Sequence, residues 1–415
     1  MPAQLPVVLA CAAASGILLA LMHLRGRGKG VLFYVAAFFT FFAYGPVVNH
    51  LLGNTIYSGI RVERIDEACV GFTLALAGLA LADALPGRVP PPPVPRADLR
   101  ADPSPDPGRL YPLHPPLLAL LVAYGAVLVV RLLPTALSAG KTEQIALAGP
   151  GHRIYLLVEL CAVSTYFLTR RTPLLRRLWA VNTATYVVYC LATAERDFLF
   201  VLFSVVLCHR LLVRRRRPSR GVVLAGLGAV VGATLLSSIR AGEAFDLTGL
   251  LNQGSLLFVD TFVIDRVPAV DGYSGGATYV RALRTLPPAW LHDPGTAGLS
   301  DWLVALYAPG SGGGYGFSLS AEAHLNFGPA GVLPVFLVLG LAVRAATDRF
   351  GRSEWSTFAG VHVTAVALYA LRGDSSQLLK SVLYGAVFFA VIHATSGRTR
   401  AVPAPGDPAR ARRTS

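Results

Sequence analysis

The chain has 415 residues, of which 53% are hydrophobic and only 14% are charged, and its formal net charge is +14. Soluble domains carry about 25% charged residues. The low charge content and the long unbroken apolar blocks exclude an ordinary soluble globular protein and predict a polytopic membrane protein.

Eleven apolar blocks have about the length of a membrane-crossing helix, which is roughly 17 to 25 residues. We therefore expect an all-α fold with about eleven transmembrane helices. Ten or twelve are alternative counts, because several blocks are short. The predicted spans are residues 4–22, 31–52, 68–85, 116–135, 154–169, 178–194, 198–213, 221–238, 328–346, 356–371 and 378–394.

The basic residues orient these spans, because short loops rich in Lys and Arg stay in the cytoplasm. With the N-terminus outside, 25 of the 37 Lys and Arg residues fall in inside segments, which are residues 23–30, 86–115, 170–177, 210–220, 344–352 and the tail after 394. We predict a multi-pass plasma-membrane protein with its N-terminus outside and its C-terminus in the cytoplasm. Nucleic-acid binding is not indicated, because the arginines flank membrane spans and lack interleaved aromatic residues.

The chain is expected to form one membrane domain over residues 1–395. The first block is predicted to be an uncleaved span, because Arg25, Arg27 and Lys29 follow it and no basic segment precedes it. Residues 86–115 are predicted to be a proline-rich cytoplasmic linker, and residues 396–415 a disordered basic tail. There is no internal repeat of the kind that builds many transporters.

One predicted outer segment, residues 239–327, is much longer than the other outer loops, and long loops in compact domains are often functional. Residues 299–307 place Leu299, Trp302, Leu303, Leu306 and Tyr307 at helical spacing, which predicts a short amphipathic helix on the membrane face. Two glycine clusters, residues 272–276 and 310–316, are not followed by Lys-Ser or Lys-Thr, so tight turns are favoured over a phosphate-binding loop.

Arginine should be scarce on the outer side of the membrane, yet this loop contains several. The guanidinium group binds phosphate through two parallel hydrogen bonds, so a lipid-linked diphosphate is a candidate ligand. The alternative is local ion pairing with Asp260, Asp265 and Asp271. The candidate phosphate ligands are Arg240, Arg266, Arg281 and Arg284 in the loop and Arg196 at the mouth of the seventh predicted span.

A carboxylate, an imidazole and an amide alternate just before the ninth predicted span, at Glu322, His324 and Asn326. In an extended segment all three would share one face, whereas in a helix they would fan out. Glu322 or His324 is a candidate to take a proton from a sugar hydroxyl. The alternative is that Glu322 orients neighbouring backbone and His324 only packs.

No histidine shows metal-site spacing, so neither a metal nor a cofactor is expected. Glu159 lies inside the fifth predicted span, where a carboxylate is a functional candidate by default. We favour a structural role, in which Glu159 hydrogen-bonds to the polar groups of the sixth predicted span, Asn182 and Thr183.

Three stretches within residues 190–345 resemble the bacterial O-antigen polymerase family, the Wzy-type oligosaccharide repeat-unit polymerases. The first is Glu195-Arg196-Asp197-Phe198-Leu199 at the mouth of an apolar span. The second is Tyr273-Ser274-Gly275-Gly276-Ala277-Thr278-Tyr279 with Arg281-Ala282-Leu283 and Leu286-Pro287-Pro288. The third is Ser318-Leu319-Ser320-Ala321-Glu322-Ala323-His324-Leu325-Asn326-Phe327-Gly328, leading through Gly331 into a span. His324 departs from the family, which more often has an aromatic residue there.

The resemblance implies a metal-independent, inverting membrane glycosyltransferase. Such an enzyme moves a growing glycan from one polyprenyl-diphosphate carrier to a sugar hydroxyl of another lipid-linked oligosaccharide repeat unit. The arginines would stabilise the leaving diphosphate, and Asn326 and Tyr279 would contact sugar. Membrane lipid and a chain-length regulator protein are the further partners considered.

Three other functions stay open from the sequence. The nearest is a ligase that uses the same donor with a different acceptor. The second is a polysaccharide exporter or lipid flippase, which is disfavoured because the polar residues concentrate in one outer loop. The third is a scaffold of an envelope assembly complex.

Overall fold

The computed structural model describes residues 4–26, 30–53, 63–86, 109–136, 138, 141–149, 151–170, 172–193, 195, 197–214, 216–221, 256–287, 298–307 and 316–398, with isolated positions between 224 and 251. Much of the predicted eighth span, most of the proline-rich linker, most of the basic tail, Arg196 and Arg240 lie outside these residues.

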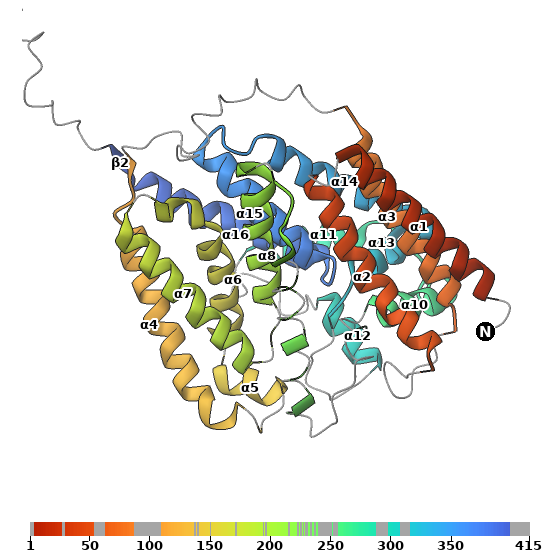
Figure 1. The fold of residues 1–415 in the computed structure, drawn as a ribbon. Coiled ribbons are helices and arrows are strands. Elements are labelled where there is room, and N and C mark those ends of the chain that lie inside the picture. Colours follow the sequence, from red (N-terminus) through yellow and green to blue (C-terminus); the bar gives the residue numbers. More distant parts are fainter. Residues whose placement is uncertain are drawn as a thin grey trace, which may run out of the picture.

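The described chain is helical apart from a pair of two-residue strands (Figure 1). Ten of the eleven predicted spans coincide with helices; the eighth falls largely outside the described residues. The helices are α1 (Leu5–Gly26), α2 (Val31–Leu51), α3 (Ile65–Ala84), α4 (His114–Leu132), α5 (Lys141–Ala148), α6 (Gly151–Ser164), α7 (Pro173–Ala192), α8 (Asp197–Cys208), α10 (Leu256–Arg266), α11 (Ala277–Arg284), α12 (Leu299–Tyr307), α13 (Leu319–Phe327), α14 (Pro329–Asp348), α15 (Glu354–Ala370) and α16 (Ser375–Ala394), with the short turns η2 (Leu133–Thr135), η3 (Tyr166–Arg170) and η4 (His209–Val213).

Six of these segments are long and apolar enough to cross a membrane: α1, α2, α3, α4 with η2, α14 and α16. The protein is therefore a helical, multi-pass membrane protein. The count of eleven spans stays a prediction, because α6, α7, α8 and α15 are shorter or less apolar by the same measure.

The first helix bundle consists of α1, α2, α3 and α14. Phe39 of α2 lies at its centre, 5.1 Å from the ring of Phe336 and 6.1 Å from that of Phe72. Glycines let α3 and α14 approach closely: a Cβ atom at Gly78 would lie 2.5 Å from the backbone oxygen of Leu333. Small residues at such contacts are typical of packing between membrane helices.

The second bundle consists of α4, α6 and α7, and α8, α15 and α16 lie between the two bundles (Figure 1). Tyr155, Tyr186 and Tyr189 are buried in its core. Asn182 donates a hydrogen bond of 2.6 Å to Glu159, which confirms the predicted structural role of this carboxylate. The hydroxyl of Thr183 has no partner within the described part of the chain.

The two ends of the molecule are built from different segments of the chain. At one end β1 (Arg109–Leu110) pairs with β2 (Gly397–Arg398), so the predicted linker and tail meet there. The short helices α5, α10 and α12 lie at the opposite end (Figure 1). The charge pattern predicts that this second end is outside, and we refer to it as the outer end.

The long loop contains short helices, as predicted for residues 299–307, but α12 is placed differently. Its residues Leu299 and Leu303 are buried in a cluster with Phe258 of α10 and Phe317. The predicted contact of this stripe with the membrane face is wrong for these two residues, because neighbouring segments of the same loop cover them. Leu306 remains 42% exposed.

Candidate active site

The segment with Glu322, His324 and Asn326 is helical, which decides between the two predicted arrangements. The hydroxyl of Ser318 accepts a hydrogen bond of 3.0 Å from the Ala321 amide and begins α13. Gly328, with φ of +69°, ends the helix. Because 3.6 residues make one turn, Glu322 and Asn326 share a face and His324 points elsewhere.

Glu322 joins three helices at the outer end. Its Oε1 accepts hydrogen bonds from the hydroxyls of Thr278 in α11 (2.8 Å) and Ser375 in α16 (2.7 Å), and its Oε2 accepts one from the Ser375 amide (2.6 Å). Its side chain is almost completely buried, and desolvation raises the pKa of the carboxyl group, against the lowering effect of the Ser375 and Thr278 hydrogen bonds.

Asn326 holds the turn that precedes α11. Its Oδ1 accepts a hydrogen bond of 2.9 Å from the Gly276 amide, and its Nδ2 donates one of 2.6 Å to the Thr278 hydroxyl. Gly272, Gly275 and Gly276 all have positive φ, which glycine adopts without steric cost. The predicted reading of this glycine cluster as a tight turn is confirmed.

His324 points away from the face of α13 that carries Glu322 and Asn326, whereas Tyr279 of α11 lies near both of these side chains. Desolvation lowers the pKa of His324; the charge of Glu67 in α3 acts against this, and the charge of Arg64 adds to it. The ring of Tyr279 stacks on Phe327 at 6.1 Å. Burial and the nearby Glu322 charge raise the pKa of Tyr279.

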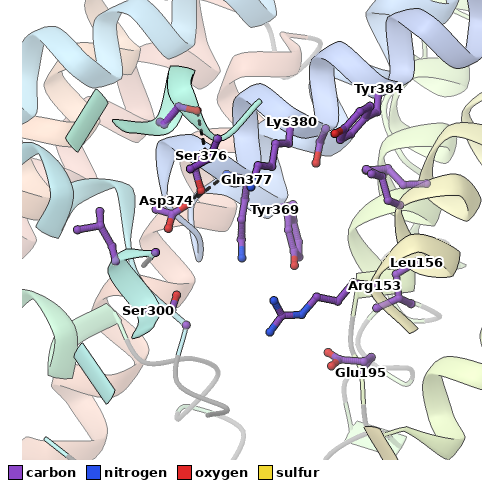
Figure 2. Close-up of a pocket in the computed structure, with 18 of the residues that line it drawn as sticks. Arg153, Leu156, Glu195, Ser300, Tyr369, Asp374, Ser376, Gln377, Lys380 and Tyr384 are labelled. Atoms are coloured by element: carbon purple, nitrogen blue, oxygen red, sulfur yellow. Dashed lines mark hydrogen bonds between the residues drawn. The ribbon is translucent and has the colours of Figure 1, made fainter. Parts of the chain in front are cut away.

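A cavity of about 520 Å³ opens at this end between the second bundle, the short helices α11 and α12, and the ends of α15 and α16. Figure 2 shows Arg153 and Glu195 entering it from the side of α6 and α7, opposite Asp374 and Ser300. The cavity is also lined by Thr278, Arg281 and Glu322 and by polar and aromatic side chains of α15 and α16, namely Tyr369, Ser376, Gln377, Lys380, Ser381 and Tyr384.

The five predicted arginines have four different outcomes. Arg281 lines the cavity, together with Thr278, Ala282 and Thr285 on the same face of α11. Arg284, one turn further, is exposed and does not line it. Arg266 is paired with Asp271 at 2.7 Å, the local ion pairing that the sequence left open. Arg196 and Arg240 lie outside the described residues.

Sequence reasoning missed several residues of the cavity. Arg153 lies immediately before the fifth predicted span and Lys380 lies within the eleventh, and neither was considered as a site residue. A charge near the end of an intramembrane helix is itself a functional signal, and it was available in the sequence. Asp374, which caps α16 through the Gln377 amide at 3.0 Å, had no local pattern beyond its capping position.

A second buried carboxylate, that of Asp260, contacts the start of α13, which was not predicted from the sequence. Asp260 of α10 accepts hydrogen bonds from the hydroxyls of Ser318 (2.7 Å) and Ser320 (3.0 Å). Desolvation raises its pKa to about 7, and the two serine hydrogen bonds act in the opposite direction. Asp260 thus anchors the start of α13 to the rest of the long loop, and within the described residues it has no arginine partner.

Chemically, the cavity combines cations, carboxylates and aromatic rings in one partly enclosed space. Such concave sites with a few convergent polar groups are typical of small-molecule binding and catalysis. Within the described residues, no three His, Cys, Asp or Glu side chains are grouped as a metal site requires.

The fold and site define a multi-pass helical membrane protein with a charged cavity at one end. The family model for O-antigen polysaccharide polymerase Wzy matches residues 295–398, which form α12 to α16 and contribute one wall of the cavity. The predicted resemblance to the Wzy-type family is therefore confirmed, and the match supports an O-antigen polymerase function in broad terms. No match was found among curated proteins or among solved structures.

Proposed function

We propose that the protein polymerises a surface polysaccharide at the outer face of the plasma membrane. It transfers a growing glycan from one polyprenyl-diphosphate carrier to a sugar hydroxyl of a lipid-linked oligosaccharide repeat unit. The cavity at the outer end is the site of transfer. The match to the Wzy family and the composition of the cavity support this proposal.

The observation that carries the proposal is that three basic side chains in the cavity have no ion-pair partner among the described residues. Arg153, Arg281 and Lys380 come from α6, α11 and α16 and line one cavity. Within the described part of the chain the structure gives none of them an ion pair. Three arginines outside the cavity are instead paired with neighbouring carboxylates, Arg64 with Glu67, Arg266 with Asp271 and Arg344 with Asp348, whereas other exposed arginines such as Arg349 face solvent.

Unpaired cations in a partly enclosed site attract an anion, and a diphosphate is the anion that glycosyl transfer releases. Preorganised cations stabilise the charge that develops on this leaving group in the transition state. In the same cavity, Tyr369, Tyr384 and Gln377 provide flat rings and an amide group suited to sugar contacts.

Of the two roles predicted for Glu322, proton acceptor or orienting group, we assign it the orienting role. Three donors engage its two oxygens, so the carboxylate holds α11 and Arg281 in position against α16. Asn326 supports the same helix through Gly276 and Thr278. His324, Tyr279, Arg266 and Arg284 stay weaker proposals, because they do not line the cavity.

The test is elongation in proteoliposomes that contain the purified protein and polyprenyl-diphosphate-linked repeat units. Replacing Arg281, Arg153 or Lys380 with Gln should lower the elongation rate about 100- to 1,000-fold, the usual cost of losing one transition-state charge contact. Arg349→Gln, an exposed residue at the opposite end, serves as the matched control and should elongate like the wild type.

Normal polymer length in all three cavity variants would overturn the proposal. Transfer of glycan to a different acceptor, with no elongation of repeat units, would assign a ligase to the same cavity. Movement of repeat units across the bilayer without transfer would assign a flippase.

A further inference from the structure

On the α6–α7 wall of the cavity a buried imidazole links a phenol to a carboxylate. His152 Nδ1 lies 2.6 Å from Tyr189 Oη, and His152 Nε2 lies 3.6 Å from Glu195 Oε1. Tyr189 is fully buried, and the side chains of His152 and Glu195 are 5% and 14% exposed. His152 and Glu195 both line the cavity.

The other carboxylates of the cavity serve the backbone or neighbouring hydroxyls. Asp374 accepts hydrogen bonds from the Ser376 hydroxyl (2.7 Å) and the Gln377 amide (3.0 Å) at the start of α16. Asp301 accepts one of 3.1 Å from the Gly298 amide at the start of α12. Glu322 uses both oxygens for three donors. Among the described carboxylates that line the cavity, Glu195 is the one coupled to an imidazole.

We propose that Glu195 is the general base that takes the proton of the acceptor hydroxyl, and that His152 and Tyr189 are positioning residues. This assignment rests on the proposed glycosyl transfer. Tyr189 donates its O–H to Nδ1, which leaves the ring proton on Nε2, facing Glu195 Oε1. At 3.6 Å this second contact is longer than a hydrogen bond. Catalytic contacts of this kind shorten when substrate binds.

The step is balanced in atoms and electrons. The acceptor hydroxyl oxygen forms a bond to the anomeric carbon of the donor glycan while its proton moves to the Glu195 carboxylate. The bond from the anomeric carbon to the carrier diphosphate breaks, and the diphosphate leaves with the electron pair. The Glu195 carboxyl group then returns its proton to water.

The electrostatic surroundings of Glu195 come from several elements. Among the described residues that line the cavity, the charged groups besides Glu322 and Glu195 are Arg153 of α6, Arg281 of α11, Asp301 of α12, Asp374 at the start of α16 and Lys380 of α16. Figure 2 shows the Glu195 carboxylate directed into the open space below Arg153, where an acceptor sugar would be within reach.

The first experiment measures elongation in the same proteoliposomes with Glu195→Gln. A general base contributes about 100- to 10,000-fold to rate, so elongation should fall by at least about 100-fold. Binding of a polyprenyl diphosphate to the purified variant should stay close to that of the wild type. Glu195→Asp should retain part of the rate. The matched control is Glu143→Gln, an exposed glutamate on α5 that does not line the cavity.

The second experiment tests the positioning role. Tyr189→Phe and His152→Gln should lower the rate about tenfold or more and shift the acid limb of the pH–rate profile, a readout that a purely structural role would not move. Combined with Glu195→Gln, neither substitution should cause a comparable further loss. Tyr189→Phe preserves the ring, so it tests the hydroxyl even if His152→Gln fails to fold.

Near-normal elongation by Glu195→Gln, or loss of diphosphate binding together with its activity, would overturn the assignment of the base while leaving the polymerase proposal intact. An unshifted profile in Tyr189→Phe would overturn the positioning role. A wild-type protein that does not elongate repeat units at all would overturn both proposals.

Discussion

The first helix bundle and the cavity end of the molecule are both buried, but they use burial in opposite ways. In the bundle of α1, α2, α3 and α14, phenylalanine rings pack together, and Gly78 and Gly340 let α3 and α14 approach closely. At the cavity end, polar groups are buried at the cost of their solvation, and the hydrogen bonds that join Glu322 and Asn326 to α11 and α16 compensate for that cost. Packing stabilises the first region, and hydrogen bonding gives the second region its geometry.

The largest effect is expected from Glu322→Ala, because Glu322 connects α13 to α11 and α16 at the cavity end. The substitution leaves the Thr278 hydroxyl and both Ser375 donors without their acceptor. An unsatisfied buried polar group costs about 1–3 kcal/mol. We therefore expect both elongation and thermal stability in detergent to fall strongly. Glu322→Gln, which keeps one acceptor oxygen, should recover part of both. An active and stable Glu322→Ala variant would contradict the claim that Glu322 holds α11, α13 and α16 together.

A smaller effect, confined to stability, is expected from Gly78→Ala in the bundle. The new Cβ atom would lie 2.5 Å from Leu333 O and 2.8 Å from Leu337 N, and these backbone atoms cannot move aside without separating α3 from α14. Overpacking of this kind costs about 1–3 kcal/mol. Gly71→Ala in the same helix is the control, because its Cβ would meet nothing within 4 Å. Equal melting temperatures for the two variants would refute this account of the close approach.

The smallest effect is a pH dependence that separates the two regions. Burial raises the pKa of Asp260 to about 7 in the folded protein, above its ordinary value of 3.8. The folded state therefore binds this proton more tightly than the unfolded state, so its contribution to stability is greatest below pH 3.8 and is lost as pH rises toward 7. Between pH 5 and pH 6 the loss should be about 1 kcal/mol, since one proton is worth about 1.4 kcal/mol per pH unit.

Thermal melts of the wild type and Asp260→Asn across this range measure the dependence. The variant has no titrating group at this position, so its melting temperature should vary less with pH. Equal slopes for the two proteins would show that Asp260 is not the source. Gly78→Ala should keep the wild-type slope, because the bundle that it disturbs does not contain Asp260.

Much of the fold was accessible from the sequence because its signals are local. A membrane span is recognised from about twenty consecutive residues, and ten of the predicted spans coincide with helices. The structural partner of Glu159 was also predictable, because Asn182 lies in the next predicted span. The conformation of residues 319–327 was not, because alternating polar residues fit either a strand or a helix, and the Ser318 cap decided for the helix.

The sequence by itself determined the class of protein: a helical, multi-pass membrane protein with a Wzy-like segment and with arginines predicted on its outer side. Only the tertiary structure decided that Arg281 shares a cavity with Arg153, Lys380 and Glu195, that Arg266 is paired elsewhere, and that Glu322 and His324 face apart. The physical reason is that each of these relations depends on contacts between helices far apart in the chain. Apolarity places a helix in the membrane, but it does not specify the rotation of that helix or its neighbours.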